Sequence, residues 1–147
     1  MDTLSVPGEL DSLTPIREFV DRAAAAAGLE RKAGYRLRLA VDEIATNVIN
    51  YGYEGANRSG NIRLEATSDD AWLTISMEDA GILFDPTAAE EPDNLDDPLE
   101  ERPIGGLGIF LTVRGVDAFR YEQRDGRNVN VFAMRRPGAD GPAEGAA

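Results

Sequence analysis

The sequence predicts an α+β two-layer sandwich, in which a mixed, mainly antiparallel sheet carries its helices on one face. Two early segments have the apolar period of amphipathic helices, and four later segments alternate apolar and polar residues as strands do. The strands fall into two pairs with tight turns, so each pair forms an antiparallel hairpin that helices can cover. The 147 residues suit one domain, expected over residues 1–136.

A short edge strand at residues 4–6 is expected to precede the first helix. Thr14 is the predicted N-cap residue, because Pro15 suits the first helical position. The helix should run to about Ala27, and Gly28 should end it. One face carries its apolar residues, which are Ile16, Phe19, Val20 and Ala23.

The second helix is expected from Glu30 to about Tyr51, with Gly52 as the residue that ends it. Its apolar residues follow each other at spacings of four, three, four and three, which is the period of an amphipathic helix. They are Leu37, Val41, Ile44, Val48 and Tyr51.

The strands are expected at residues 61–68, 72–78, 118–123 and 128–135. Asp69-Asp70 and Asp125-Gly126 are the predicted hairpin turns, since tight turns favour these residue types. Between the hairpins, residues 85–101 hold eight acids, three prolines and no base, which predicts a mobile loop. A glycine-led helix is expected at 105–115 and a disordered tail at 137–147.

The composition excludes several chemistries. Cys and His are absent, so any bound metal must have oxygen ligands, as Mg²⁺ or Ca²⁺ do. Lys32 is the only lysine, and its surroundings fit neither a P-loop nor the strand lysine of a eukaryotic-type kinase. The net charge of −12 disfavours a direct nucleic-acid partner. Without an apolar run of membrane-spanning length or a signal peptide, a cytoplasmic protein with no membrane contact is expected.

Three segments are candidates for a site, and each also has a simpler interpretation. Glu43 and Asn47 lie four residues apart on one helix face, where they form either a site or an ordinary solvated edge. Asp79 and Gly81 follow a strand, where a ligand can approach the backbone or a plain turn can lie. A glycine cluster opens a helix whose N-terminus suits phosphate, or serves as a hinge for the acidic loop. Its members are Gly105, Gly106 and Gly108.

Taken together and in this order, the three segments resemble the GHKL ATP-binding fold, the Bergerat or histidine-kinase ATPase (HATPase) fold that gyrase and histidine kinases share. They resemble the bacterial anti-sigma-factor serine/threonine kinases more closely. The resemblance extends over about residues 5–136. The stretches that carry it are 42–53, 79–86, 105–111, 116–117 and 124–128.

The resemblance implies a role for each matching residue. Glu43 would be the general base that activates a serine or threonine hydroxyl, and the side-chain oxygen of Asn47 would bind Mg²⁺. The Asp79 carboxylate would accept a hydrogen bond from the adenine amino group, with Gly81 below the base. The backbone of Gly105, Gly106 and Gly108 would form the phosphate cradle, and Arg102 would reach the γ-phosphate. Asn128, where the family often has threonine, would donate a hydrogen bond to phosphate. Arg17 would contact a protein partner. Leu83 stands where the family often has glycine or proline, and is expected to tighten the floor of the adenine pocket.

By this resemblance the chain would bind ATP and Mg²⁺, hold a sigma factor inactive and phosphorylate a STAS-domain anti-anti-sigma factor. The resemblance also allows a homodimer. Three alternatives stay open: an ATP-gated switch protein without kinase activity, a small ATPase or partner-switch kinase in another signalling pathway, and an acidic domain that binds no nucleotide. The residues themselves indicate that a site built on Glu43 and Asn47 suits phosphoryl transfer, which needs mainly positioning and charge neutralisation.

Overall fold

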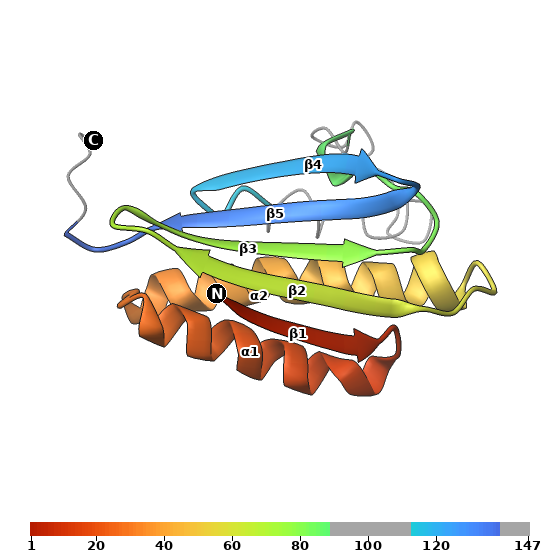
Figure 1. Cartoon of the computed structure of the whole chain (residues 1–147), viewed down its shortest axis with the longest axis horizontal. Helices are drawn as coiled ribbons and strands as arrows, with labels where there is room; N and C mark the ends of the chain where they lie inside the picture. Colours follow the sequence, from red (N-terminus) through yellow and green to blue (C-terminus); the bar gives the residue numbers. More distant parts are fainter. Residues whose placement is uncertain (89–112, 139–147) are drawn as a thin grey trace, which may run out of the picture.

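The computed structural model describes residues 1–88 and 113–138. They form a five-stranded sheet with two long helices against one face (Figure 1). The strands are β1 (Asp2–Pro7), β2 (Asn61–Ser68), β3 (Trp72–Asp79), β4 (Ala118–Arg124) and β5 (Arg127–Arg135). The helices are α1 (Leu13–Ala26) and α2 (Arg31–Asn47), and the shorter helical segments are η1 (Leu10–Ser12), η2 (Val48–Glu54) and η3 (Pro86–Ala88).

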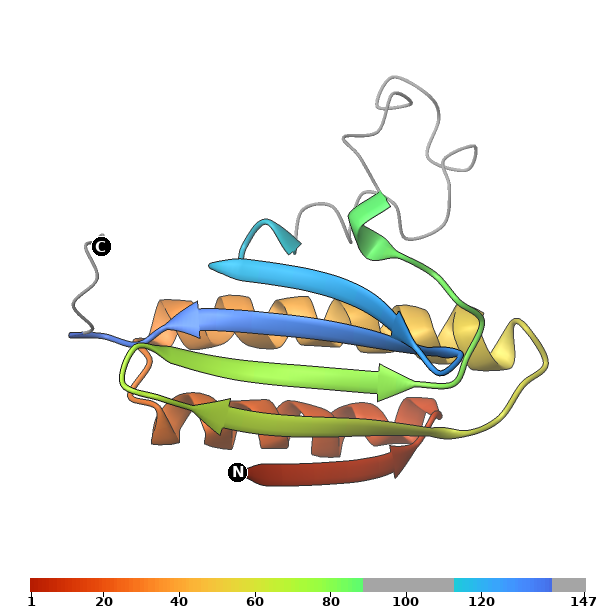
Figure 2. The same ribbon diagram turned by 45° about the horizontal axis from the view of Figure 1, so that its top comes forward.

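The strand order across the sheet is β1-β2-β3-β5-β4, and all pairings among the described strands are antiparallel (Figure 2). This arrangement confirms the predicted fold class, the edge position of the first strand and both hairpins. The pairing of β3 with β5 joins the two hairpins at the centre of the sheet. Its register puts Asp79, the last residue of β3, opposite Asn128.

The core lies between the helices and the inner face of the sheet. In β2 and β3, the buried residues of that face alternate with more exposed residues of the outer face, as expected for a sheet that is covered on one side. Phe119 and Phe132 meet edge to face, with ring centroids 5.2 Å apart. The largest side chains with almost no exposure are Tyr53, Phe132, Ile16, Leu37, Ile44, Ile49, Ile62, Leu64, Ile75, Met77 and Met134.

Helix α1 begins earlier than the sequence predicts. Its N-cap position is Ser12 rather than Thr14, and η1 leads into it. The Ser12 hydroxyl does not cap the helix but donates to the carbonyl oxygen of Pro7 at 2.6 Å. The start of α1 is therefore set by a contact with the end of β1, which a local capping pattern cannot reveal. Gly28 ends the helix as predicted, in a left-handed conformation with φ of +74°.

The prediction that one helix runs to Tyr51 and ends at Gly52 is wrong. Regular α-helix ends at Asn47, and a π-helical segment, η2, continues through Gly52 to Glu54. The wider turns of a π-helix change which side chains face the core. Tyr53 is consequently 1% exposed, whereas Tyr51, the last residue of the predicted apolar stripe, is 43% exposed.

Both predicted hairpin turns are present. The Asp69 carboxylate accepts hydrogen bonds from the backbone N–H groups of Ala71 and Trp72, each at 2.8 Å. Asp125 and Gly126 both have positive φ, +54° and +78°. Two left-handed residues in succession give the turn whose twist matches an antiparallel hairpin.

Most of the predicted acidic loop and of the glycine-led helix lies outside the described residues, as does the predicted tail beyond residue 138. Of the helices in residues 1–88 and 113–138, none combines the length and the apolar character that crossing a membrane requires.

Candidate functional site

A pocket of about 230 Å³ lies between the helix layer and the sheet, at the end where β3 stops and β5 starts. Three parts of the chain that are distant in sequence line it. The helical part contributes Ile44, Asn47, Val48, Tyr51 and Gly52, the end of β3 and the following loop contribute Asp79, Ile82, Phe84 and Pro86, and β5 contributes Asn128 and Asn130. The pocket thus brings together three residues that the sequence singled out: Asn47, Asp79 and Asn128.

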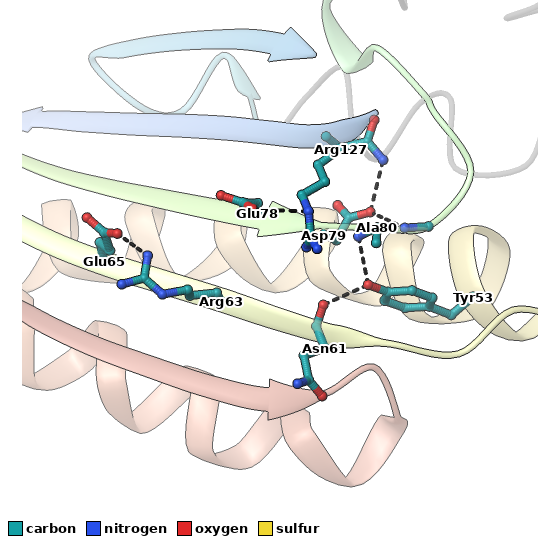
Figure 3. Close-up of polar contacts among 10 residues, drawn as sticks. Tyr53, Asn61, Arg63, Glu65, Glu78, Asp79, Ala80 and Arg127 are labelled. Atoms are coloured by element: carbon teal, nitrogen blue, oxygen red, sulfur yellow. Dashed lines mark hydrogen bonds and ion pairs between the residues drawn. The ribbon is translucent and has the colours of Figure 1, made fainter. Parts of the chain in front are cut away.

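The Asp79 carboxylate is the most distinctive group in this pocket. It lies at the end of β3 (Figure 3) and is fully buried. Its Oδ1 accepts two hydrogen bonds, from the backbone N–H of Gly81 and from Nδ2 of Asn128, each at 2.9 Å. Its Oδ2 is also buried and accepts no hydrogen bond from the described residues. A buried acceptor without a donor costs free energy, so Asp79 offers a strong position for a ligand that carries an N–H group.

Burial raises the pKa of Asp79 above its ordinary value of 3.8. The hydrogen bonds from Asn128 and Gly81 act in the opposite direction, the charge of Glu78 adds to the rise, and Arg127 lowers it. Desolvation is the largest of these effects, and it raises the pKa because burial disfavours the charged form of the carboxyl group. A donor from a ligand would compensate the ionised carboxylate for the lost water.

Gly81 lies where the loop after β3 crosses the π-helical segment. The N–H of Ile82 donates to the carbonyl oxygen of Gly52 at 3.0 Å, which holds the two backbones together. A Cβ on Gly81 would lie 2.9 Å from both the carbonyl carbon and the oxygen of Gly52. Backbone atoms cannot move aside as a flexible side chain can, so this crossing requires glycine.

Asn128 uses its whole amide group within the protein. Its Nδ2 donates to Asp79 Oδ1 at 2.9 Å and to the carbonyl oxygen of Ile82 at 3.0 Å. Its Oδ1 accepts from the backbone N–H of Phe84 at 3.0 Å and from the hydroxyl of Tyr121. The phosphate role stays a prediction, and the contacts here fix Asp79 and the loop that follows it.

Asn130 is a pocket residue that the sequence analysis missed. It is buried, and its Oδ1 accepts no hydrogen bond from the described residues. It lies two positions after Asn128, on the strand face that also carries Phe132. A polar residue in phase with the apolar Phe132 and Met134 on the inner face of β5 is the signal that would have identified it.

The other predicted positions are distributed around the pocket. Asn47 lines it, whereas Glu43, one helical turn earlier, is not among the lining residues. Arg17 lies on α1, where its Nε donates to Asp42 at 2.6 Å, and this contact raises the pKa of Arg17. Leu83 does not form the pocket floor, because it is not among the lining residues, whereas its neighbours Ile82 and Phe84 are. The described residues do not include Arg102, Gly105, Gly106 or Gly108.

Comparison with known proteins agrees with this geometry. The histidine kinase-like ATPase domain family matches residues 6–134. Serine-protein kinase RsbW of Listeria monocytogenes is 28% identical over 130 residues, which cover 86% of this chain and 82% of that protein. Anti-sigma F factor of Clostridium acetobutylicum is 30% identical over 101 residues, 68% of each chain.

Two solved structures share the fold at low sequence identity. Histidine kinase AdeS of Acinetobacter baumannii has a TM-score of 0.51 at 9% identity, and the match covers 94% of this chain and 70% of that one. The histidine kinase domain of the blue-light activated kinase of Erythrobacter litoralis has a TM-score of 0.50 at 14% identity, covering 84% and 59%. The chain therefore belongs to the histidine kinase-like ATPase family, within the group of the anti-sigma-factor kinases.

Proposed function

We propose that this protein is an ATP-binding anti-sigma regulatory serine/threonine-protein kinase. The observation that carries the proposal is the unpartnered Oδ2 of Asp79 in a pocket lined largely by apolar side chains. The amino group of adenine is an N–H donor on a flat apolar ring, so it suits both features. Because Gly52 and Gly81 lie backbone to backbone, no side chain of theirs occupies the space beside the carboxylate.

The proposal extends from the base to the phosphates. Asn47 lines the same pocket from the end of α2, where its side-chain oxygen would contribute to a Mg²⁺ site. Mg²⁺ in nucleotide sites takes few protein ligands and completes its shell with phosphates and water. When bound, the metal supplies charge neutralisation for phosphoryl transfer. Arg102 and the glycines at 105, 106 and 108 keep their proposed phosphate roles from the sequence.

Glu43 is the proposed general base. It lies on α2 one helical turn before Asn47 and does not line the pocket proposed for adenine. An incoming hydroxyl would therefore approach from the side of α2 and not through the adenine pocket. The hydroxyl would belong to a serine or threonine of a STAS-domain anti-anti-sigma factor.

The names of the relatives, which describe a serine-protein kinase and an anti-sigma factor, support the sigma-factor part of this proposal. We propose that this chain likewise binds a sigma factor in the cytoplasm and releases it according to its nucleotide and its STAS partner. Arg17, part-exposed on α1 beside Asp42, is the proposed contact residue.

Phosphate transfer to a STAS protein tests this function. The full-length chain is incubated with Mg²⁺, γ-labelled ATP and a STAS protein, as wild type and as Glu43→Ala. Loss of a general base should reduce transfer by about 10²–10⁴-fold and leave nucleotide binding close to wild type. Glu65→Ala is the matched control, because Glu65 pairs with Arg63 on the sheet face away from the helices.

The outcomes separate the alternatives. Wild-type transfer by Glu43→Ala would contradict the role of Glu43. Nucleotide binding without transfer to any STAS protein would support the ATP-gated switch protein instead. A wild type that binds neither ATP nor ADP would refute the nucleotide function as a whole.

A further inference from the structure

Tyr53 connects three parts of the fold through a single hydroxyl group. It lies in η2, and its side chain is buried. The hydroxyl donates to the carbonyl oxygen of Asn61 at 2.7 Å and accepts from the backbone N–H of Ala80 at 2.8 Å. Asn61 begins β2 and Ala80 directly follows β3, so this hydroxyl joins the helix layer to the ends of two strands (Figure 3).

The Tyr53 ring packs against two glycines, Gly8 and Gly60, and occupies space that a side chain on either of them would need. A Cβ on Gly8 would lie 2.2 Å from ring atom Cδ2, and a Cβ on Gly60 would lie 3.1 Å from the hydroxyl oxygen. The N–H of Gly8 donates to the carbonyl oxygen of Gly60 at 2.8 Å, which fixes these two backbones beside the ring. The position of the hydroxyl is therefore set by packing as well as by its own hydrogen bonds.

The π-helical segment holds the turn after β3 at two points. Tyr53 binds Ala80, and the residue before it, Gly52, accepts a hydrogen bond from Ile82. Between these two points, the N–H of Gly81 donates to Oδ1 of Asp79. The segment that orients the Asp79 carboxylate is thus fastened on both sides by two consecutive residues of η2.

We propose that Tyr53 is a positioning residue for purine base selection: its hydroxyl fixes the turn after β3 so that Oδ2 of Asp79 meets the group at position 6 of the base. This inference rests on the proposed ATP function. Without the hydroxyl, the N–H of Ala80 and the carbonyl of Asn61 lose their partner. Both contacts are part-buried. A polar backbone group that loses its partner in such a place is costly, so the turn shifts until water or another group satisfies it.

The shift has a selective consequence. A 6-amino purine donates to Asp79 and depends on the position of the carboxylate. A 6-oxo purine presents an acceptor at the same place, so it gains nothing from that carboxylate. Contacts to the phosphates come from other parts of the chain, such as Asn47 on α2, and do not involve Tyr53. Loss of the hydroxyl should therefore weaken ATP binding while ITP binding changes little.

Calorimetric titration of the full chain with Mg·ATP and Mg·ITP tests this inference. The variants are Tyr53→Phe and, as a matched control, Tyr35→Phe, because Tyr35 is exposed on α2 and outside the pocket. We expect wild type to prefer ATP. Tyr53→Phe should weaken ATP binding by about tenfold, which corresponds to 1.4 kcal/mol, with ITP affinity nearly unchanged. Tyr35→Phe should leave both affinities as in wild type.

A change in overall stability alone would lower both affinities together, so the ratio of ATP to ITP affinity is the decisive quantity. An equal ratio in wild type and Tyr53→Phe overturns the inference and leaves the ATP function standing. A wild type that binds no nucleotide, or binds ATP and ITP equally, overturns the base contact of Asp79 as well.

A second measurement uses only the wild-type chain, in case Tyr53→Phe does not fold. Hydrogen exchange at the Ala80 amide should slow when the protein is saturated with Mg·ATP, because the base then holds Asp79 and its turn in place. Saturation with Mg·ITP should leave that exchange rate close to the free protein. Equal protection of Ala80 by both nucleotides overturns the inference.

Discussion

Replacing Asp79 by asparagine tests the base pocket with the smallest change in shape. Oδ1 of Asp79 accepts from two fixed donors, the N–H of Gly81 and Nδ2 of Asn128. An asparagine must therefore place its own oxygen toward these donors. Its amide NH₂ then takes the position of Oδ2 and faces the pocket, where it meets the adenine amino group as donor against donor.

The size of the effect follows from this geometry. A hydrogen bond to a charged group contributes about 1.5–3 kcal/mol, and its loss corresponds to roughly 10–150-fold in Kd. The stability of the fold should not decrease, because burial disfavours the ionised carboxylate of Asp79, as its raised pKa shows. Asparagine has no such charge to bury. We expect the free energy of unfolding of Asp79→Asn at pH 7 to equal or exceed that of wild type.

Calorimetry with Mg·ADP and Mg·ATP measures the affinity, and thermal unfolding measures the stability. Asp69→Asn is the matched control, since Asp69 lies in the β2–β3 turn at the opposite end of β3 and should keep wild-type affinity. Wild-type nucleotide affinity in Asp79→Asn would refute the base contact. A parallel loss of affinity and stability would refute the argument that the fold tolerates the change.

Three further outcomes are expected. Because the pKa of Asp79 in the folded protein is raised, nucleotide affinity should decrease as the pH falls through that raised value toward 3.8. Over the same pH range, protonation of Asp79 should make the folded state more stable. Titrations across pH should show both changes in wild type and neither in Asp79→Asn. Gly81→Ala should lower both thermal stability and nucleotide affinity, because its Cβ would lie 2.9 Å from the Gly52 backbone. Gly34→Ala in α2, whose Cβ would meet only the Ala24 Cβ of α1 at 3.5 Å, should instead stabilise the fold by about 0.5–1 kcal/mol in thermal unfolding. Asn47→Ala should weaken ATP binding in the presence of Mg²⁺ but not in its absence, and equal losses under both conditions would contradict a metal role.

Three pocket residues, Asn47, Asp79 and Asn128, could be named from the sequence because the short segments around them, taken together and in order, resemble a known family. Asp79 and Gly81 follow a strand with clear alternation, and Asn47 follows the helical stripe of α2. The prediction failed where a residue acts through partners distant in the chain. The strand pattern of β5 places Asn130 on the inner face but does not show that a pocket opens there, and only the packed structure shows that Ile82 and Phe84 line the pocket whereas Leu83 does not.

The sequence by itself determined the elements and their faces, because helix and strand periods reflect which side chains must leave water within a few residues of each other. It also determined the turn at Asp125 and Gly126, since few residues accept positive φ. Only the tertiary structure decided that β3 pairs with β5, in the register that puts Asn128 against Asp79 across 49 positions of sequence. The same holds for the π-helical segment and for Tyr53, whose hydroxyl bonds to backbone groups of two strands. Such contacts depend on how whole elements pack against each other, and local sterics and hydropathy contain no information about that packing.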